Sequence, residues 1–402
     1  MNINKTPIKT KALAMIVSII LITLSAPVCA ADDETDATTD GIINEYSNFY
    51  GEQLQDAWND LYSDISPNLP ADLDISQLIA SIAKGDLGFN VTDILNWLIK
   101  AFANEVYASV KLLTLVLALA VVSSYLTNLN DSFGKNGIGV IAHYICIILI
   151  SSVAVTAFYQ VVSSAAMAAE NLSVFMRMIV PLMLAALLSS GAIVSASVFE
   201  PVLLTIIELS VSLIQNLFIP VVMLLSALSI VNSLSDKFKA SRLVTLLENF
   251  IKRGLSVLLT VFVAFAGLQS IASSGADGLT IKLTKFASSN LIPVVGGILS
   301  ESVETIMNCS VVIKNSVGIV GIIIVVFISI TPLLKIMASL FVFRVIAAMC
   351  EPVSDSKTTA CLTCLADSIS LVFSMLAAIT VMFVIIITII INTGNLAAAL
   401  GR

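Results

Sequence analysis

The residues best suited to chemistry in this sequence are polar side chains inside long apolar stretches. Glu208, Gln215 and Asn216 lie within the apolar run 202–231, and Lys335 lies in a later run. Glu208 and Gln215 are seven residues apart, so a helix places them on one face. Ionisable groups inside a membrane usually face a bundle interior or a water-filled path, so the pattern predicts a polar path between helices. The alternative interpretation puts Glu208 near the outer membrane surface and has Lys335 snorkelling to the inner surface.

Metal, redox and nucleotide chemistry find little support. Cys361 and Cys364 have CxxC spacing with Cys350 nearby, but a structural zinc site needs four ligands, so we expect packed thiols. The single histidine, His143, has no carboxylate near it in the sequence. A GxxxxGK[ST] phosphate-binding loop is absent, and nothing favours nucleic-acid binding. We expect no enzyme activity, no metal and no cofactor, and an external motor for any step driven by ATP.

The elements that position these residues are membrane helices. The chain has 402 residues, of which 58% are hydrophobic and 12% charged, well away from a soluble domain. Apolar runs such as 317–330 and 372–391 approach or reach the length of about 20 residues that crosses a bilayer as a helix. The sequence predicts an all-α, polytopic helical membrane protein, with a membrane domain of about six or seven spans over 106–402. The apolar runs 138–162 and 178–199 are expected to be separate elements, with residue 163 outside the membrane.

The N-terminal quarter has a different character. Residues 1–30 combine a lysine-containing start, a short apolar core and a small-residue end, which predicts a cleavable signal peptide; an uncleaved first span is the alternative. Residues 31–105 contain fifteen acids and two lysines. Apolar residues at helical spacing predict helices over 39–65 and 74–84 and a third that starts near Thr92 and could run straight into the first span. We expect a small acidic helical domain on the exported side, its charge serving solubility or a basic partner.

The stretch 178–200 is apolar enough to span a membrane, yet its centre is small and polar. The centre reads Ser189-Ser190-Gly191. A turn at membrane depth needs protein or water as hydrogen-bond partners. The stretch is therefore either a span or a re-entrant hairpin with its tip at these three residues.

The loop that follows is the most basic in the chain, and bases favour the cytoplasmic side. If 178–200 spans, loop 232–253 lies outside; if it is a hairpin entered from the exported side, the loop is cytoplasmic. The charge pattern favours the hairpin, and the span remains the alternative. The basic residues of this loop are Lys237, Lys239, Arg242, Lys252 and Arg253.

Residues 239–253 also predict an amphipathic helix. Leu243, Leu247, Phe250 and Ile251 share one helical face, with bases at both ends. Such a helix either lies on the cytoplasmic lipid surface or packs on a partner, and both interpretations stay open.

Proline spacing hints at an internal repeat. Pro181 to Pro220 is 39 residues, and so is Pro293 to Pro332. A repeat predicts helix breaks at these four prolines and a second re-entrant hairpin near 288–307. The tip of that hairpin is expected at Ser300, Glu301 and Ser302.

Three tracts resemble a known family. They are NLSVFMRMIVPLMLAALLSSGAIVSASVFEPVLL (171–204), LSDKFKASRLVTLLENFIKRGLSVLLTVF (234–262) and LFVFRVIAAMCEPVSD (340–355). Together with the signal peptide and the acidic region, they resemble the stage III sporulation protein AE family of endospore formers. The resemblance covers nearly the whole mature chain and rests on overall pattern rather than on a catalytic signature.

The resemblance implies a membrane component of a secretion or feeding channel between mother cell and forespore, needed for late forespore gene expression. It also implies a location in the mother-cell membrane around the forespore. The implied partners are the other stage III sporulation A proteins, including a separate ATPase and ring-forming proteins, and the forespore stage II protein Q. The residues alone leave two alternatives open: a self-contained secondary transporter of a small solute, and a passive scaffold for ring-forming partners.

Overall fold

The computed structural model describes residues 37–65, 74–83, 91–133, 137–234, 240–264, 267, 296–352 and 356–401. Every regular element in these ranges is a helix, which confirms the predicted all-α class. The elements are α2 (Ala37–Ile65), α3 (Ile75–Ala83), α4 (Val91–Ala108), α5 (Val110–Phe133), α6 (Gly137–Ser189), α7 (Ile193–Leu213), the π-helix η1 (Ile214–Phe218), α8 (Ile219–Leu234), α10 (Gly296–Cys350) and α11 (Ser356–Gly401). A further helix covers residues 241–264.

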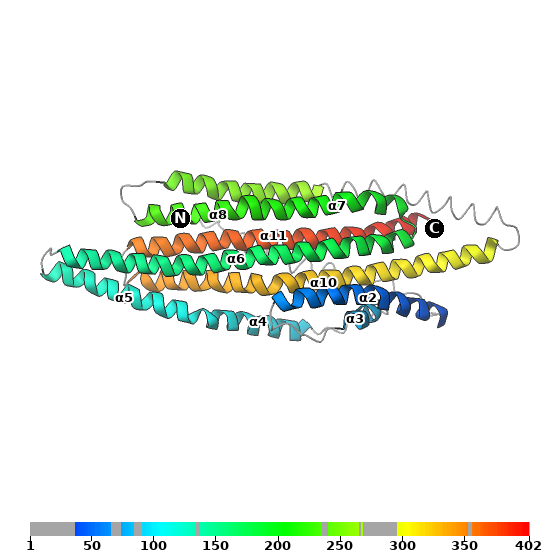
Figure 1. Cartoon of the computed structure of the whole chain (residues 1–402), viewed down its shortest axis with the longest axis horizontal. Coiled ribbons are helices and arrows are strands. Elements are labelled where there is room, and N and C mark those ends of the chain that lie inside the picture. The colour runs from blue at the N-terminus through cyan, green and yellow to red at the C-terminus, as the bar shows by residue number, and fades with distance from the viewer. Residues whose placement is uncertain are drawn as a thin grey trace.

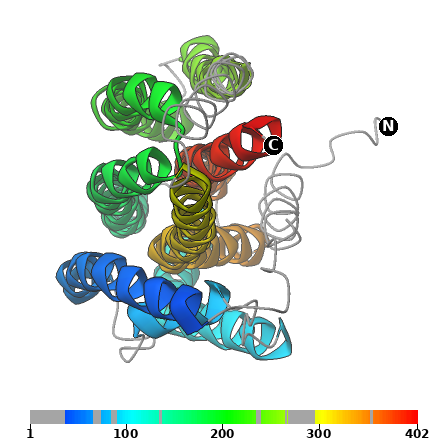
Figure 2. The same ribbon diagram turned by 90° about the vertical axis from the view of Figure 1, so that its right-hand side faces the viewer.

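The helices form one elongated bundle, with α6, α10 and α11 lying roughly parallel to its long axis (Figure 1). Seen along that axis, α10 lies near the centre, with α11 on one side, α6 on the other and the N-terminal helices below it (Figure 2). Five helical stretches among the described residues are long and apolar enough to cross a membrane. The chain is thus a multi-pass membrane protein by length and composition.

Helix α6 differs from the sequence-based expectation. The runs 138–162 and 178–199 were expected to be separate, with residue 163 in a loop outside the membrane, but residues 137–189 form one helix. The intervening segment, SSAAMAAENL at 163–172, is rich in alanine and methionine, which are strong helix formers. The two runs therefore belong to one of the five long apolar stretches found among the described residues.

The chain reverses direction at Ser190 and Gly191. The Gly191 N–H donates to the Leu188 carbonyl at 3.0 Å, and the Ala192 N–H donates to the Leu187 carbonyl at 3.3 Å. These two bonds make a Schellman motif, whose C′ residue must adopt positive φ. Gly191 supplies that conformation, with φ of 86°. The arms that meet here are far longer than the roughly nine residues that fit a re-entrant hairpin, because α6 and the α7–α8 segment each exceed 40 residues.

The expected second hairpin is not present. Ser300, Glu301 and Ser302 lie within the continuous helix α10, near its start, so they form no turn. The physical reason is the order of the glycines: Gly296 and Gly297 precede these residues, and the next glycine is Gly318. No glycine therefore lies at the supposed tip or directly after it.

The four prolines do not act as a set of helix breaks. Pro181 lies inside α6 and Pro332 inside α10, both of which continue past them. A helical proline removes one hydrogen bond and bends the helix, but packing on several sides holds the helix together. Pro220 follows η1 at the start of α8, and Pro293 lies outside the described residues. The proposed repeat therefore has no counterpart in the described helices.

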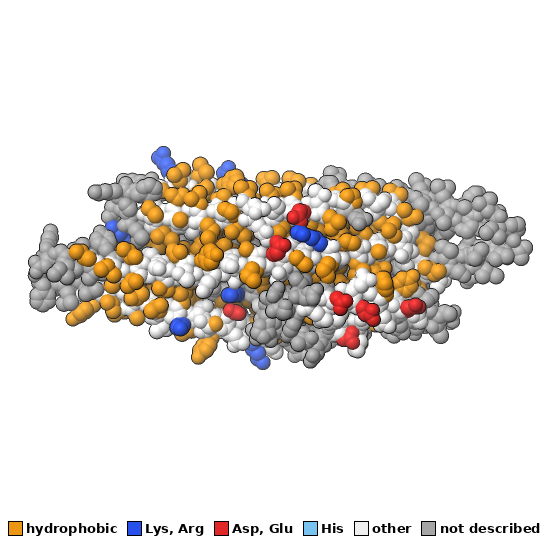
Figure 3. Space-filling model, in the orientation of Figure 1, with side chains coloured by type: hydrophobic (Ala, Val, Ile, Leu, Met, Phe, Trp, Pro, Cys, Tyr) orange, Lys and Arg blue, Asp and Glu red, His pale blue; other side chains and the backbone are white. Residues whose placement is uncertain are grey.

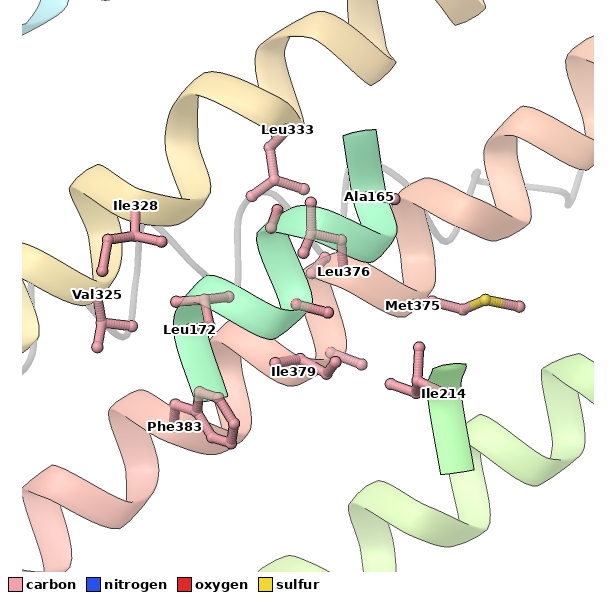
Figure 4. Close-up of a cluster of buried hydrophobic side chains, with 14 of the residues drawn as sticks. Ala165, Leu172, Ile214, Val325, Ile328, Leu333, Met375, Leu376, Ile379 and Phe383 are labelled. Carbon is pink, nitrogen blue, oxygen red and sulfur yellow. The ribbon is translucent and has the colours of Figure 1, made fainter. Parts of the chain in front are cut away.

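The core of the bundle surrounds α11. Side chains from four segments meet there, as Figure 4 shows: Leu172 of α6, Ile214 of η1, Val325 of α10 and Phe383 of α11 are among them. Gly318 and Gly321 let α10 approach α6 and α11 closely, because a Cβ at either position would overlap neighbouring isoleucine side chains.

The N-terminal helices share this core instead of forming a separate one. Helices α2 and α3 pack against each other and along α10. Their buried side chains belong to the same apolar cluster as the membrane helices: Tyr50, Leu54, Trp58, Ile75, Ile79 and Ile82. Helices α2, α3 and α4 correspond to the three helices expected in 31–105, and α4 continues into α5 after a single non-helical residue, Ser109. The predicted signal peptide lies outside the described residues.

The helix ends lie at the two opposite ends of the bundle. The C-terminal ends of α5, α8 and α10 lie at the left end in Figure 1, and the turn between α6 and α7 lies toward the right end. The bundle therefore places the chain before Gly137 and the chain after Leu234 on the same side. This arrangement agrees with the side expected from charge, although two long helices produce it instead of a short hairpin.

Candidate functional site

A row of polar side chains joins α6 to α7 and η1. The Arg177 Nη2 lies 2.7 Å from the Glu208 Oε2, and the Gln215 Nε2 donates to the Glu170 Oε2 at 2.9 Å. Gln215 also donates to the Ala166 carbonyl at 3.4 Å. We call Glu170, Arg177, Glu208 and Gln215 the polar row.

The turn at Gly191 sets the register of this row. Glu170 and Arg177 are seven residues apart, as are Glu208 and Gln215, so each pair occupies one face of its helix. The turn folds the two arms antiparallel. Arg177 and Glu208 lie 14 and 17 residues from Gly191, and Glu170 and Gln215 lie 21 and 24, so the same offset of three residues brings both pairs together. The Arg177–Glu208 pair lies about 20 Å from the turn, and Glu170–Gln215 lies about 30 Å from it, at 1.5 Å per helical residue.

A π-helical segment interrupts the second arm at the row. The Ile219 N–H donates to the Ile214 carbonyl five residues earlier. Pro220 follows directly and has no N–H to donate, so a local change of hydrogen-bond pattern accommodates it. Asn216, which was expected in the polar path, turns to its own helix and donates to the Ser212 Oγ at 3.1 Å.

The polar row faces outward from the bundle. The side chains of Arg177 and Glu208 are 48% and 62% exposed, and Glu170 is also exposed. Figure 3 shows acidic and basic side chains together midway along this face, with apolar side chains on both sides. An exposed ion pair contributes only about 0–1 kcal/mol to stability in water, so the row is better suited to recognition or lining than to holding the fold.

The fourth residue of the expected path lies elsewhere. Lys335 is exposed on α10, and α10 has no extensive contact with α7 in the part of the chain described. The structure therefore brings Glu208 and Gln215 together with two residues that sequence reasoning missed, Glu170 and Arg177. The matching seven-residue spacings on either side of Gly191 were the signal that could have found them.

The interior of the bundle is mainly apolar. Its buried polar side chains, among the described residues, are serines and threonines together with Lys314 and Asn315. Many of the hydroxyls donate to carbonyls of their own helix, as Ser316 does to Val312 and Thr380 to Leu376. Lys314 is fully buried, and its Nζ donates to the Ile391 carbonyl of α11 at 2.6 Å. A single lysine in an apolar stretch was the sequence signal for it, and it was overlooked.

The basic segment forms part of the 241–264 helix. Ile251 and Leu255 are buried, and Phe250 makes an edge contact with Phe218 of η1. Arg242, Lys252 and Arg253 are exposed, and Lys252 pairs with Glu248. Leu243, on the predicted apolar face, is exposed, and the contact with η1 involves the C-terminal part of the segment. Lys237 and Lys239 lie outside the described residues.

The cysteines pack against serine hydroxyls. The Cys361 Sγ lies 3.8 Å from the Ser151 Oγ of α6, and the Cys364 Sγ lies 3.8 Å from the Ser233 Oγ of α8. Within the described ranges, no group of three or more histidine, cysteine or carboxylate side chains could hold a metal ion. The CxxC pair thus joins α11 to two neighbouring helices.

Comparison with known proteins identifies relatives over most of the chain. The sequence profile of the family described as stage III sporulation protein AE matches residues 73–394. A Bacillus subtilis (strain 168) protein described as stage III sporulation protein AE is 30% identical over 345 residues, which cover 86% of each chain. No solved structure matches.

Proposed function

Because the chain belongs to the stage III sporulation protein AE family, we propose that it is a membrane subunit of a sporulation secretion or feeding channel. This channel would link mother cell and forespore and support late gene expression in the forespore. The chain would lie in the mother-cell membrane that surrounds the forespore.

The outward-facing polar row is the observation that carries this proposal. The buried side chains of the described residues are mainly apolar, and the polar ones among them are serines, threonines, Lys314 and Asn315. A polar path lined by Glu208 and Gln215 therefore lies between this chain and its neighbours, not inside it. That arrangement favours a subunit of a larger assembly over a self-contained transporter.

The proposed partners follow from the same reasoning. The sequence carries no phosphate-binding loop, so an external ATPase among the stage III sporulation A proteins would supply energy. The ring-forming proteins and the forespore stage II protein Q would meet the chain on the exported side. A scaffold role remains the second candidate, because the exposed acids of α2 offer a docking face that needs no path: Glu45, Glu52 and Asp56.

Charge reversal across the polar row tests the proposal. Arg177→Glu and Glu208→Arg are each made in a sporulating cell that lacks its own copy of the protein, and the two are then combined. We expect each single reversal to abolish late forespore gene expression and the double variant to recover it in part. Protein abundance should stay unchanged, because an exposed pair contributes little to folding.

A matched control exists on another face. Arg344 and Asp367 form an exposed pair between α10 and α11 at 3.3 Å, with side chains 57% and 59% exposed. Reversing Arg344 should leave expression near the normal level. Normal expression in Glu208→Arg would contradict the path, and solute transport by the purified chain alone in vesicles would favour the transporter.

A further inference from the structure

The long helices exceed the thickness of one membrane. Helix α6 has 53 residues and α10 has 55, so each is about 80 Å long at 1.5 Å per residue. A bilayer is about 30 Å thick in its hydrocarbon core and about 40–45 Å with headgroups. Nearly half of each helix must therefore lie outside the bilayer.

The acidic helix α2 shows which half cannot face hydrocarbon. It lies beside the N-terminal, yellow part of α10 (Figure 1) and packs against it. Glu45, Glu52 and Asp56 are exposed on its outer side, and acidic side chains gather in the lower right of Figure 3. Carboxylates at membrane depth are rare and almost always face protein or water. The half of the bundle that carries α2 is thus excluded from lipid.

The other half presents an apolar surface of membrane thickness. Residues 137–169 of α6 contain no Asp, Glu, Lys or Arg, and the exposed side chains from Ile141 to Tyr159 are mostly large and apolar. The distance from Ile141 to Glu170 is about 44 Å along the helix, which matches a bilayer with its headgroups. Helix α5 extends the surface with exposed Leu115, Val121 and Val122.

We propose that the bilayer surrounds only the half of the bundle formed by α5, α8, the N-terminal half of α6 and the C-terminal part of α10. The half with α2, α3, α7 and the turn at Gly191 stands in the aqueous exported compartment. Glu170 and Gln215 then mark the outer membrane boundary. The exposed bases of the 241–264 helix, Arg242 among them, lie toward the opposite end, as the preference of bases for the cytoplasm requires.

In this placement the turn at Gly191 lies in the aqueous compartment and not inside the membrane. Ser190 and Gly191 need no lipid-depth partners, because the Schellman bonds and the bond from the Ser190 Oγ to the Leu187 carbonyl satisfy the turn locally. The inference does not depend on the proposed channel function, since it concerns only which surface contacts lipid.

Cysteine labelling tests the placement with matched sites. Leu188 and Val198 in the exported half are each 47% exposed, and Leu149 and Val155 in the lipid half are 47% and 40% exposed. Each is changed to cysteine in a full-length chain whose native cysteines have been replaced and whose function has been checked. A charged, membrane-impermeant maleimide is then added outside protoplasts, with Glu52→Cys as the exposed reference.

We expect Leu188→Cys and Val198→Cys to react at rates close to the reference. Leu149→Cys and Val155→Cys should react about 100-fold more slowly, since a charged reagent pays about 3 kcal/mol or more to enter hydrocarbon. Fluorophores attached at the two slow sites should be quenched by brominated lipid, and those at the two fast sites should not.

Three results would overturn the placement. Protection of Leu188→Cys and Val198→Cys together with lipid quenching there would put the membrane over both halves. Rapid labelling of Leu149→Cys or Val155→Cys would put water at the proposed lipid surface. Protection of those two sites without lipid quenching would show that a second copy or another protein covers the face.

Discussion

Lys314 combines complete burial with a carbonyl contact between two helices. Its exposure is 0%, and its Nζ donates to the Ile391 carbonyl, so it joins α10 to the C-terminal part of α11. Asn315 beside it is also buried, and its Oδ1 accepts no hydrogen bond in the described structure. Burying an amine costs more free energy than burying an apolar side chain of equal size. The lysine is therefore a residue that packing alone does not explain.

Substitutions at Lys314 separate packing from charge. Lys314→Met keeps most of the volume and removes the buried amine, so we expect an unchanged or higher melting temperature for the purified protein in detergent. Lys314→Ala leaves a cavity, which costs about 2–4 kcal/mol by analogy with other large-to-small changes in cores. A methionine variant less stable than the alanine variant would contradict this reasoning and show that the amine itself stabilises the helix pair.

Residue-level chemistry could be read from the sequence only in part. The seven-residue spacing of Glu208 and Gln215 placed them on one face, and both contact α6 from that face. Their partners could not be assigned, because partner choice depends on the register of two helices and so on the turn between them. Lys335 was expected beside them because it also lies inside an apolar run. The position of a residue along a helix does not determine which side of the helix it faces.

At the scale of elements, the turn at Gly191 joins the long helix α6 to α7. Its φ of 86° lies in the left-handed region, where a side chain adds steric strain. We expect Gly191→Ala to lower the free energy of unfolding by about 1–2 kcal/mol. The measurement is thermal unfolding of the purified variant in detergent.

Gly41 in α2 is the matched control for that substitution. A Cβ added at Gly41 would have no neighbouring heavy atom within 4 Å. Gly41 lies inside helix α2, and its φ is not positive. Gly41→Ala should leave stability unchanged or raise it by up to about 1 kcal/mol, since alanine is the better helix former. Equal destabilisation by both substitutions would mean that the turn conformation carries no special cost.

Element boundaries were predictable where local signals agreed. Apolar spacing located α2, α3 and α4, and the Ser-Ser-Gly sequence located the turn. The break predicted near residue 163 is wrong, because the less apolar segment there is rich in helix formers and continues the helix. The hairpin predicted at Ser300 is wrong, because proline spacing alone does not make a turn and no glycine lies at or directly after this tip.

At the scale of the whole molecule, the acidic N-terminal helices and the apolar bundle form one body. Tyr50, Leu54 and Trp58 of α2 are at most 4% exposed and belong to the common core. Composition suggested a separate domain, since charge and hydropathy change near residue 105. Composition cannot reveal that α2 packs on the bundle, because the few apolar residues on its buried side hardly change the average hydropathy of the helix.

The outer side of α2 is the surface that this arrangement leaves for partners, and its charge can be reversed without touching the core. Glu45, Glu52 and Asp56 are exposed, whereas the buried residues of α2 lie on the opposite side. We expect the triple change of these acids to lysine to reduce co-purification of exported-side partners at least tenfold, because loss of attraction and new repulsion together exceed about 1.4 kcal/mol. Membrane insertion and melting temperature should stay the same.

The loss of co-purification should also become smaller as the salt concentration rises, since exposed charges are screened over about 8 Å at physiological ionic strength. If the triple variant co-purifies partners as well as the wild type does, α2 is not the docking face. If co-purification is lost to the same extent at every salt concentration, the helix has misfolded.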